Sequence, residues 1–231
     1  MVLVSTRNPL NIGAAARAMS NFGFSQLRAV NPYDLAFREA RSAVGAAPVL
    51  AQAKVFASVA EAVADCSLVV GTTAAHNREL HHPMYRLAEA APLIRRKLIS
   101  AKVALLFGSE KRGLSNHDLS YCHWLLHIPT EGGHLSMNLG QAVAVCLYEL
   151  GRAAQVHSSA KRQLSQAADL DILTATLVDT LRISGYLKPR SGVATDDKIR
   201  RLVRRLNLSS EDAETWLGML RQMTWKMKSG E

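Results

Sequence analysis

The pattern of apolar residues changes near residue 155, and this change limits the folds that a chain of 231 residues can adopt. Before it, short apolar runs rich in β-branched and aromatic residues alternate with segments of helical composition. Gly, Pro, Asn or Ser bound these runs, which is typical of strands. The order strand, helix, strand predicts an α/β fold with a mostly parallel sheet. We expect strands at 2–4, 26–30, 68–70, 103–107 and 124–128, and helices at 14–22, 59–64, 85–97 and 138–154.

The last third of the chain shows helical periodicity and no strand-like run. A segment rich in Gln and Ser separates it from the first part. We therefore expect an α/β domain at residues 1–155, a linker at 156–167 and a small all-α domain at 168–231, with a role in RNA binding or dimer support. In the first helix of that domain Leu170, Leu173, Leu177 and Leu181 form one apolar stripe, and Gly185 ends the helix.

The final helix opens at a capping pair formed by Ser209 and Asp212. Its apolar side chains recur on one face, and we expect them to pack in a core rather than to bind a ligand. These side chains are Trp216, Met219, Leu220, Met223 and Met227.

The chain is basic, with 28 Lys and Arg against 19 Asp and Glu and a net charge of +9. Such a charge attracts polyanions and makes nucleic acid the leading candidate partner, although many soluble proteins are basic without binding RNA. One short helix of the last third carries a cluster of cations. The cluster is either a phosphate-contacting face or a solvated basic surface, and it consists of Lys198, Arg200, Arg201, Arg204 and Arg205.

Several classes of protein are excluded by simple features. The chain opens on a strand-like run rather than on a secretory signal, and no apolar stretch reaches the ~18 residues of a membrane span. The scattered Cys66, Cys122 and Cys146 form no CxxC pair and indicate reduced thiols in a cytoplasmic protein. We expect no metal, because the histidines match no zinc spacing and are expected on the surface or in loops. The histidines concerned are His76, His81, His82 and His134.

The first of three motifs runs from Asn8 to Arg17, leaving a strand and entering a helix. Asn11 is a candidate cap of that helix, Gly13 allows another backbone to approach, and the alanine run makes a flat face. Arg17 stands out on an otherwise small and apolar turn. It is either a snorkelling surface residue or a positioned binder of phosphate or carboxylate.

The second motif, from Phe107 to Ser115, follows a hydrophobic strand and precedes a helix that Ser115 caps. Its spacing nearly matches a Walker A loop, but Leu114 replaces the essential Lys, which disfavours NTP binding. No G-x-G-x-x-G follows any strand, so the chain lacks the fingerprint of a Rossmann dehydrogenase or of the common open-sheet methyltransferases. A glycine turn remains at the carboxyl end of a strand, where α/β proteins usually bind ligands.

The third motif runs from Ile128-Pro129 through a glycine pair at 132–133 to the run 135–138, where a long helix begins. Ser136 and Asn138 are polar groups at this helix start. Free backbone N–H groups there can hold a carboxylate or the polar edge of a cofactor.

Taken together, N-x-G-A-x-x-R, F-G-S-E-x-x-G-L-S and I-P…S-M-N resemble the motifs of the SPOUT, or trefoil-knot, methyltransferases, specifically the TrmH-like ribose 2′-O-methyltransferases. The strand end at 68–74, Asn31-Pro32 and the helical C-terminal extension are most similar to the TrmJ subfamily, which methylates the ribose of nucleotide 32 in the tRNA anticodon loop. The resemblance implies a trefoil knot near motifs two and three, a rare exception to the rule against knots. It also implies S-adenosyl-L-methionine as cofactor, tRNA as substrate and a homodimer through the knot region.

The resemblance further assigns roles to residues. Arg17 is the implied catalytic residue. Because a guanidinium seldom loses its proton, we expect Arg17 to clamp the neighbouring phosphate and stabilise the developing alkoxide, while phosphate or water takes the proton. Arg7, Asn11, Glu110 and Asn138 would contact or orient the substrate. The cofactor cleft would be lined by Thr72, Thr73, Ala74, Gly108, Ile128, Leu135, Ser136 and Met137.

The chain departs from the commoner pattern of the family in two places. Gly132, Gly133 and His134 replace a longer polar segment, which bears on the substrate, and Met137 stands where Leu is usual, with similar volume. Two alternatives stay open: a 2′-O-methyltransferase acting on rRNA or another tRNA position, and a noncatalytic RNA-binding protein with the same fold.

Overall fold

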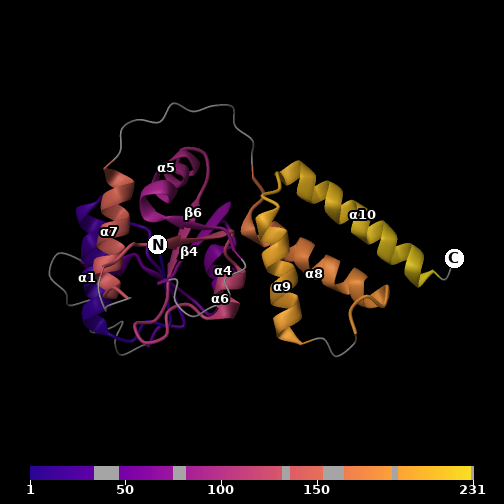
Figure 1. Ribbon diagram of the computed structural model, residues 1–231, viewed down its shortest axis with the longest axis horizontal. Coiled ribbons are helices and arrows are strands. Elements are labelled where there is room, and N and C mark those ends of the chain that lie inside the picture. The colour runs from indigo at the N-terminus through magenta and orange to yellow at the C-terminus, as the bar shows by residue number, and fades with distance from the viewer. Residues whose placement is uncertain (34–46, 75–81, 132–135, 153–163, 189–191, 230–231) are drawn as a thin grey trace.

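The computed structural model describes residues 1–33, 47–74, 82–131, 136–152, 164–188 and 192–229. These residues form an α/β part and, beside it, a part made of three helices (Figure 1). The predicted domain division at residues 155 and 168 stays a prediction, and most of the predicted linker lies outside the described residues. No described helix is both long enough and apolar enough to cross a membrane.

The α/β part is built on a seven-stranded sheet in the order β3-β2-β1-β6-β4-β7-β5. Every neighbouring pair of strands is parallel, as predicted. Because helices cover both faces of such a sheet, its central strands are near-continuous apolar runs. The strands are β1 Val2–Val4, β2 Arg28–Val30, β3 Lys54–Phe56, β4 Leu68–Thr72, β5 Met84–Arg86, β6 Val103–Phe107 and β7 Trp124–His127.

One hydrophobic core lies between the sheet and α1, α3, α5 and α7, and a second lies on the face covered by α4 and α6. Helices α1 and α7 approach each other closely, since a Cβ added at Gly140 would lie 2.6 Å from Cβ of Ala14. This approach brings the first motif and the end of the third motif together. The helices are α1 Pro9–Asn21, α3 Ala47–Ala51, α4 Val59–Val63, α5 Leu87–Leu98, α6 Asn116–Ser120 and α7 Leu139–Gly151.

All five predicted strands are confirmed, with ends shifted by a few residues, and the four predicted helices are present. The sequence did not reveal β3 and β5, which form the two edges of the sheet. An edge strand has a neighbouring strand on one side only, so its side chains are less buried. Val55 of β3 is 57% exposed and Met84 of β5 is 46% exposed. The helix predicted from residue 85 begins at Leu87, because the residues before it belong to β5.

The helical part contains α8 Ala167–Ile183, α9 Val193–Arg205 and α10 Ser210–Lys228. The stripe predicted on α8 is confirmed, since Leu170 and Leu173 are buried with Val203 and Leu220 in one core. The capping pair at Ser209 is confirmed too, because its hydroxyl accepts a hydrogen bond from the N–H of Asp212.

The core packing predicted for the final helix was largely wrong. Leu220 is buried, but the rest of the stripe lies beside the face that meets α8 and is between 39% and 54% exposed. The face of α10 that meets α8 includes Leu217 and Thr224, whose hydroxyl lies 2.8 Å from that of Thr180. The exposed members of the stripe are Trp216, Met219, Met223 and Met227.

The cation cluster on α9 is not one exposed face. Arg204 is 0% exposed and the side chain of Arg200 is 17% exposed, and both guanidinium groups are paired with carboxylates. The prediction of a phosphate-contacting face was therefore wrong for these two residues. Lys198 and Arg205 are exposed.

Candidate functional site

The carboxyl ends of β4, β6 and β7 lie side by side, because β4 pairs in parallel with both of the others. In open α/β sheets this edge is where ligands bind. A cavity of about 310 Å³ opens there. Its walls come from all three strand ends, from the loop after β6 and from the start of α7, so the second and third motifs share one cavity.

The loop after β6 is shaped by two glycines. A Cβ at Gly108 would lie 2.0 Å from the backbone carbon of Gly113, so no other residue fits. Gly113 has a φ of +66°, a conformation that favours glycine, and its N–H donates to the carbonyl of Ser109 at 2.8 Å. The loop therefore folds tightly on itself and presents backbone groups to the cavity.

Helix α6 begins directly after this loop. Ser115 accepts a hydrogen bond from the N–H of Asp118, whose carboxylate accepts in turn from the N–H of Ser115. This capping box confirms the predicted cap and fixes where the loop ends.

Most residues predicted to bind the cofactor line this cavity. Leu135 lies outside the described residues. The sequence did not single out Leu119 or Thr130, which also line it, and it treated Leu114 only as a missing lysine. The predicted residues found in the lining are Thr72, Thr73, Ala74, Gly108, Ile128, Ser136 and Met137.

A hydrogen-bond network joins the three motifs beside the cavity. Oε1 of Glu110 accepts from the backbone N–H of Asn8 and from Nδ2 of Asn11, both at 3.2 Å. Its Oε2 accepts from the N–H of Arg7 at 3.4 Å. Asn138 donates from Nδ2 to Oδ1 of Asn11 at 2.8 Å. The predicted substrate-binding residues thus come together, with Arg7 taking part through its backbone.

This network also organises two helix starts. The carboxylate of Glu110 lies at the amino end of α1, where a negative charge is stabilised by the helix dipole. Asn8, not Asn11 as predicted, caps α1, and Asn138 caps α7 by accepting from the N–H groups of Gly140 and Gln141. Pro9 follows the cap, and Asn11 lies too far along the helix to cap it. Glu110, expected to orient the substrate or Arg17, is held by these backbone and amide donors.

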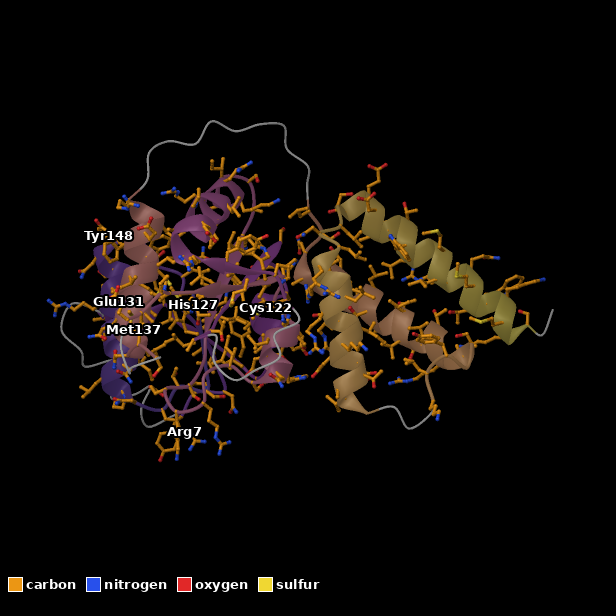
Figure 2. The ribbon with its side chains drawn as sticks, in the orientation of Figure 1. Arg7, Cys122, His127, Glu131, Met137 and Tyr148 are labelled. Carbon is orange, nitrogen blue, oxygen red and sulfur yellow. The ribbon has the colours of Figure 1, made fainter. Side chains whose placement is uncertain are left out.

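Arg17 lies elsewhere. It is exposed on α1 and is not among the residues that line the cavity. Helix α1 and its packing partner α7 also carry exposed apolar side chains. Leu10 of α1 is 79% exposed, while Val145 and Tyr148 of α7 are 36% and 54% exposed. In Figure 2, Tyr148 and Met137 lie on the side of the α/β part away from the helical part, whereas Cys122 lies toward it.

Three buried side chains have pKa values far from neutral pH. Burial raises the pKa of Cys66 to about 11 and that of Cys146 to about 12, so these thiols stay protonated. Burial lowers the pKa of His123 to about 3, and its Nδ1 accepts from the N–H of Val69. His82, expected on the surface or in a loop, lies in a bend before β5 and is 9% exposed. Within the described ranges, no three His, Cys, Asp or Glu side chains cluster as a metal site would require, and His76, His81 and His134 lie outside those ranges.

Known proteins share both the sequence and the structure of this chain. The model of the SpoU rRNA Methylase family matches residues 1–148. The tRNA (cytidine/uridine-2′-O-)-methyltransferase TrmJ of Sodalis glossinidius is 35% identical over 228 residues, which cover 95% of this chain and 89% of the relative. The tRNA (cytidine/uridine/adenosine-2′-O-)-methyltransferase TrmJ of Pseudomonas aeruginosa is 34% identical over 245 residues, covering 100% and 95%.

Among solved structures, TrmJ from Z. mobilis superposes with a TM-score of 0.84 at 32% identity and covers 96% of this chain and 97% of its own. A solved structure that concerns the 2-OH methylation of C/U34 on tRNA matches with a TM-score of 0.51 at 28% identity. It covers 65% of this chain and 91% of its own. An AdoMet-bound rRNA methyltransferase from Sinorhizobium meliloti has a TM-score of 0.51 at 25% identity, covering 65% and 54%. The chain therefore belongs to the SpoU methylase family, in the branch that contains the TrmJ methyltransferases.

Proposed function

We propose that this protein transfers a methyl group from S-adenosyl-L-methionine to the 2′-hydroxyl of a ribose in tRNA, at cytidine or uridine 32 of the anticodon loop. One observation carries the proposal: the likeness to TrmJ of Z. mobilis spans 96% of the chain. The cavity shared by the second and third motifs agrees with it. As a tRNA-modifying enzyme the protein would work in the cytoplasm.

The cavity fits the proposed cofactor. Its volume lies within the range of about 300–1,000 Å³ that is typical of small-molecule sites. Leu114, Ile128 and Met137 offer apolar surface for an adenine ring, while Thr72 and Ser136 offer hydroxyl groups for its polar neighbours. S-adenosylmethionine, when bound, supplies a methyl group on a positively charged sulfur. Leu135 would complete the cofactor site as the family resemblance implies.

The chain must then position a ribose oxygen in line with that methyl group and stabilise the charge that develops on it. Arg17 is the residue proposed for this task, since its planar guanidinium can bind a phosphate with two parallel hydrogen bonds. Glu110, Asn11 and Asn138 would hold the wall of the site through the network described above, and Arg7 would add a phosphate contact. Phosphate or water would take the proton.

In a homodimer, Arg17 of one subunit would reach the site of the other subunit, which a single chain does not complete. Arg17 lies outside the cavity on α1, and α1 and α7 expose apolar surface at Leu10, Val145 and Tyr148. A second copy packed on α1 and α7 would cover these side chains and place Arg17 between the subunits. The trefoil knot near motifs two and three stays part of this proposal.

The target nucleotide has a rival. The structure described by methylation of C/U34 on tRNA shares the α/β fold but covers only 65% of this chain. The TrmJ structure covers almost all of it, so the helical part favours a TrmJ-like target. An rRNA target and a noncatalytic RNA-binding role are the remaining alternatives.

The proposal is tested with unmodified tRNA transcripts, the purified protein and S-adenosylmethionine carrying a labelled methyl group. Mass spectrometry of nuclease fragments should place one 2′-O-methyl group at nucleotide 32. A methyl group at nucleotide 34 would overturn the position and keep the chemistry. The absence of any transfer to tRNA, together with the absence of cofactor binding, would refute the enzymatic function.

A further inference from the structure

Helix α6 lies between the proposed cofactor cavity and the helical part. It has five residues and directly follows the loop of the second motif. On one side, Leu114 before the helix and Leu119 within it line the cavity. On the other side, His117, Ser120 and Tyr121 meet α9 of the helical part. Figure 1 shows α6 on the side of the α/β part that faces α9.

Two residues of α9 hold this second side of α6. The guanidinium of Arg200 lies 4.4 Å from the centroid of the Tyr121 ring and donates to Oγ of Ser120 at 3.0 Å. Oδ1 of Asp197 lies 2.7 Å from Nη1 of Arg200 and 3.1 Å from Nδ1 of His117. Asp197 and Arg200 therefore contact two residues of α6, His117 and Ser120, and the residue that caps its end, Tyr121.

The contact is anchored in the helical part by a second ion pair. Arg204 is 0% exposed, and its Nη2 donates to Asp171 of α8 at 2.7 Å. Asp171 also lies 3.9 Å from Nε of Arg200. Four charged side chains thus form one largely buried cluster with equal numbers of each sign, in which Asp197 and Arg204 are buried and Asp171 and Arg200 are partly exposed. Such a cluster is strongly destabilised when one member is lost, which fixes Asp197 and Arg200 relative to α8 and α9.

A helix of five residues has little stability of its own, because isolated helices shorter than about 12–15 residues are marginal in water. The position of α6 is therefore set by what packs on either side of it. We propose that Asp197 and Arg200 are positioning residues for the cofactor cavity, which they shape by holding α6 and, through it, Leu114 and Leu119. Placement of the helical part and the shape of the cavity are then coupled. The naming of the ligand as S-adenosylmethionine rests on the proposed function, but the coupling does not.

The chain offers a closely matched pair of variants for the test. Asp197→Asn keeps the shape of the side chain and removes the charge that holds Arg200 and His117. Asp196→Asn makes the same change one residue away, where the carboxylate pairs with Arg182 inside the helical part and not with α6. His117→Ala removes the contact from the α6 side and leaves every charge of the buried cluster in place.

The first measurement is amide hydrogen exchange of residues 108–122 in the full chain, at a temperature where circular dichroism shows all variants folded. Exchange should be faster in Asp197→Asn and in His117→Ala than in wild type, and unchanged in Asp196→Asn. Equal exchange rates in all four proteins would overturn the proposal. This result does not depend on the identity of the ligand.

The second measurement is calorimetric binding of S-adenosylmethionine to the same proteins. A coupling of the size usual between separate sites predicts an affinity about 2- to 30-fold weaker in Asp197→Asn, with wild-type affinity in Asp196→Asn. Faster exchange without a change in affinity would show a purely structural contact and would refute the positioning role. If wild type binds no cofactor, the proposed function fails while the exchange data still decide whether α6 is held by α9.

Discussion

At the motif-bearing edge of the sheet, the carboxylate of Glu110 is held by backbone N–H groups and by the Asn11 amide. At the contact between the two parts, Arg200 and Arg204 are held by Asp171 and Asp197. The first arrangement uses residues in or beside the first and second motifs, and its donors are neutral amide groups. The second uses charged residues of α8 and α9, with Asp171 about thirty positions before Arg200 and Arg204. The polar groups of the proposed site could therefore be identified from short sequence motifs. The contact between the two parts could not, because its residues come together only in the folded chain.

The largest expected effect lies in the buried cluster. Replacement of Arg204 by Leu should lower the free energy of unfolding by about 3–5 kcal/mol, because Asp171 is left without its nearest cation in a buried place. Chemical denaturation of the full chain measures this loss. The matched control is Arg205→Leu at an exposed position, with an expected change within about 0.5 kcal/mol. Equal losses in both variants would show that the cluster is no anchor.

At the proposed site the largest effect is on catalysis and not on stability. Arg17→Ala should lower the turnover of tRNA methylation by about 10²–10³, as is usual when a donor to developing charge is removed. Cofactor affinity should stay at the wild-type value, because Arg17 does not line the cavity. Arg17→Lys should restore little, since an ammonium group cannot make the bidentate contact. Near-normal turnover of the Lys variant, measured under saturating tRNA, would contradict the clamp.

The exposed apolar side chains of the two parts are expected to behave differently. Tyr148→Glu should weaken a dimer formed through α1 and α7 by about 30-fold or more, as for a central interface residue. Tyr186→Glu, at a position of the helical part that is 78% exposed, should leave the dimer intact. Sedimentation velocity over a concentration series distinguishes the two. A monomeric wild type, or a dimer that survives Tyr148→Glu, would rule out this interface.

The smallest effect is expected for the network beside the cavity. Glu110→Gln keeps the shape of the side chain and loses one accepting oxygen, which faces the N–H of Arg7 or of Asn8. Turnover should fall by about 2- to 12-fold, the equivalent of one net hydrogen bond. Steady-state kinetics on tRNA measure it. A loss as large as that of Arg17→Ala would mean that Glu110 acts on the substrate directly.

The central strands and the place of the cavity could be predicted from the sequence for a physical reason, whereas its lining residues were implied by the family resemblance. Gly108 and Ile128 follow buried parallel strands, and the carboxyl ends of adjacent parallel strands meet at one edge. The cap of α1 was misplaced because two asparagines stand close together, and Asn8 rather than Asn11 precedes the proline that begins the helix. A local sequence pattern predicts that a helix begins there, but not which of two similar residues caps its start.

The helical part was predicted less well, because its contacts are ion pairs and packed helix faces whose partners lie far apart in the sequence. A cation in a helix looks the same in sequence whether it meets a phosphate, solvent or a carboxylate. Arg200 and Arg204 were therefore expected on a phosphate-contacting or solvated face, and the ion pairs that they form were missed. Met223 follows the spacing of a core stripe yet is 54% exposed, since α10 packs through the neighbouring face. Both errors have one cause. Periodicity shows which residues share a helix face, but not what that face packs against.

The central claim is that the cavity at the ends of β4, β6 and β7 binds S-adenosylmethionine. Calorimetric titration of the cofactor into wild type, Gly108→Ala and Gly218→Ala tests it most directly. A Cβ at Gly108 would overlap the backbone of Gly113, whereas one at Gly218 meets nothing within 4 Å. We predict equal affinities for wild type and Gly218→Ala, and a loss of about 5- to 150-fold for Gly108→Ala, the equivalent of about 1–3 kcal/mol of overpacking. Unchanged affinity in Gly108→Ala, or no binding to wild type at millimolar cofactor, would contradict the claim.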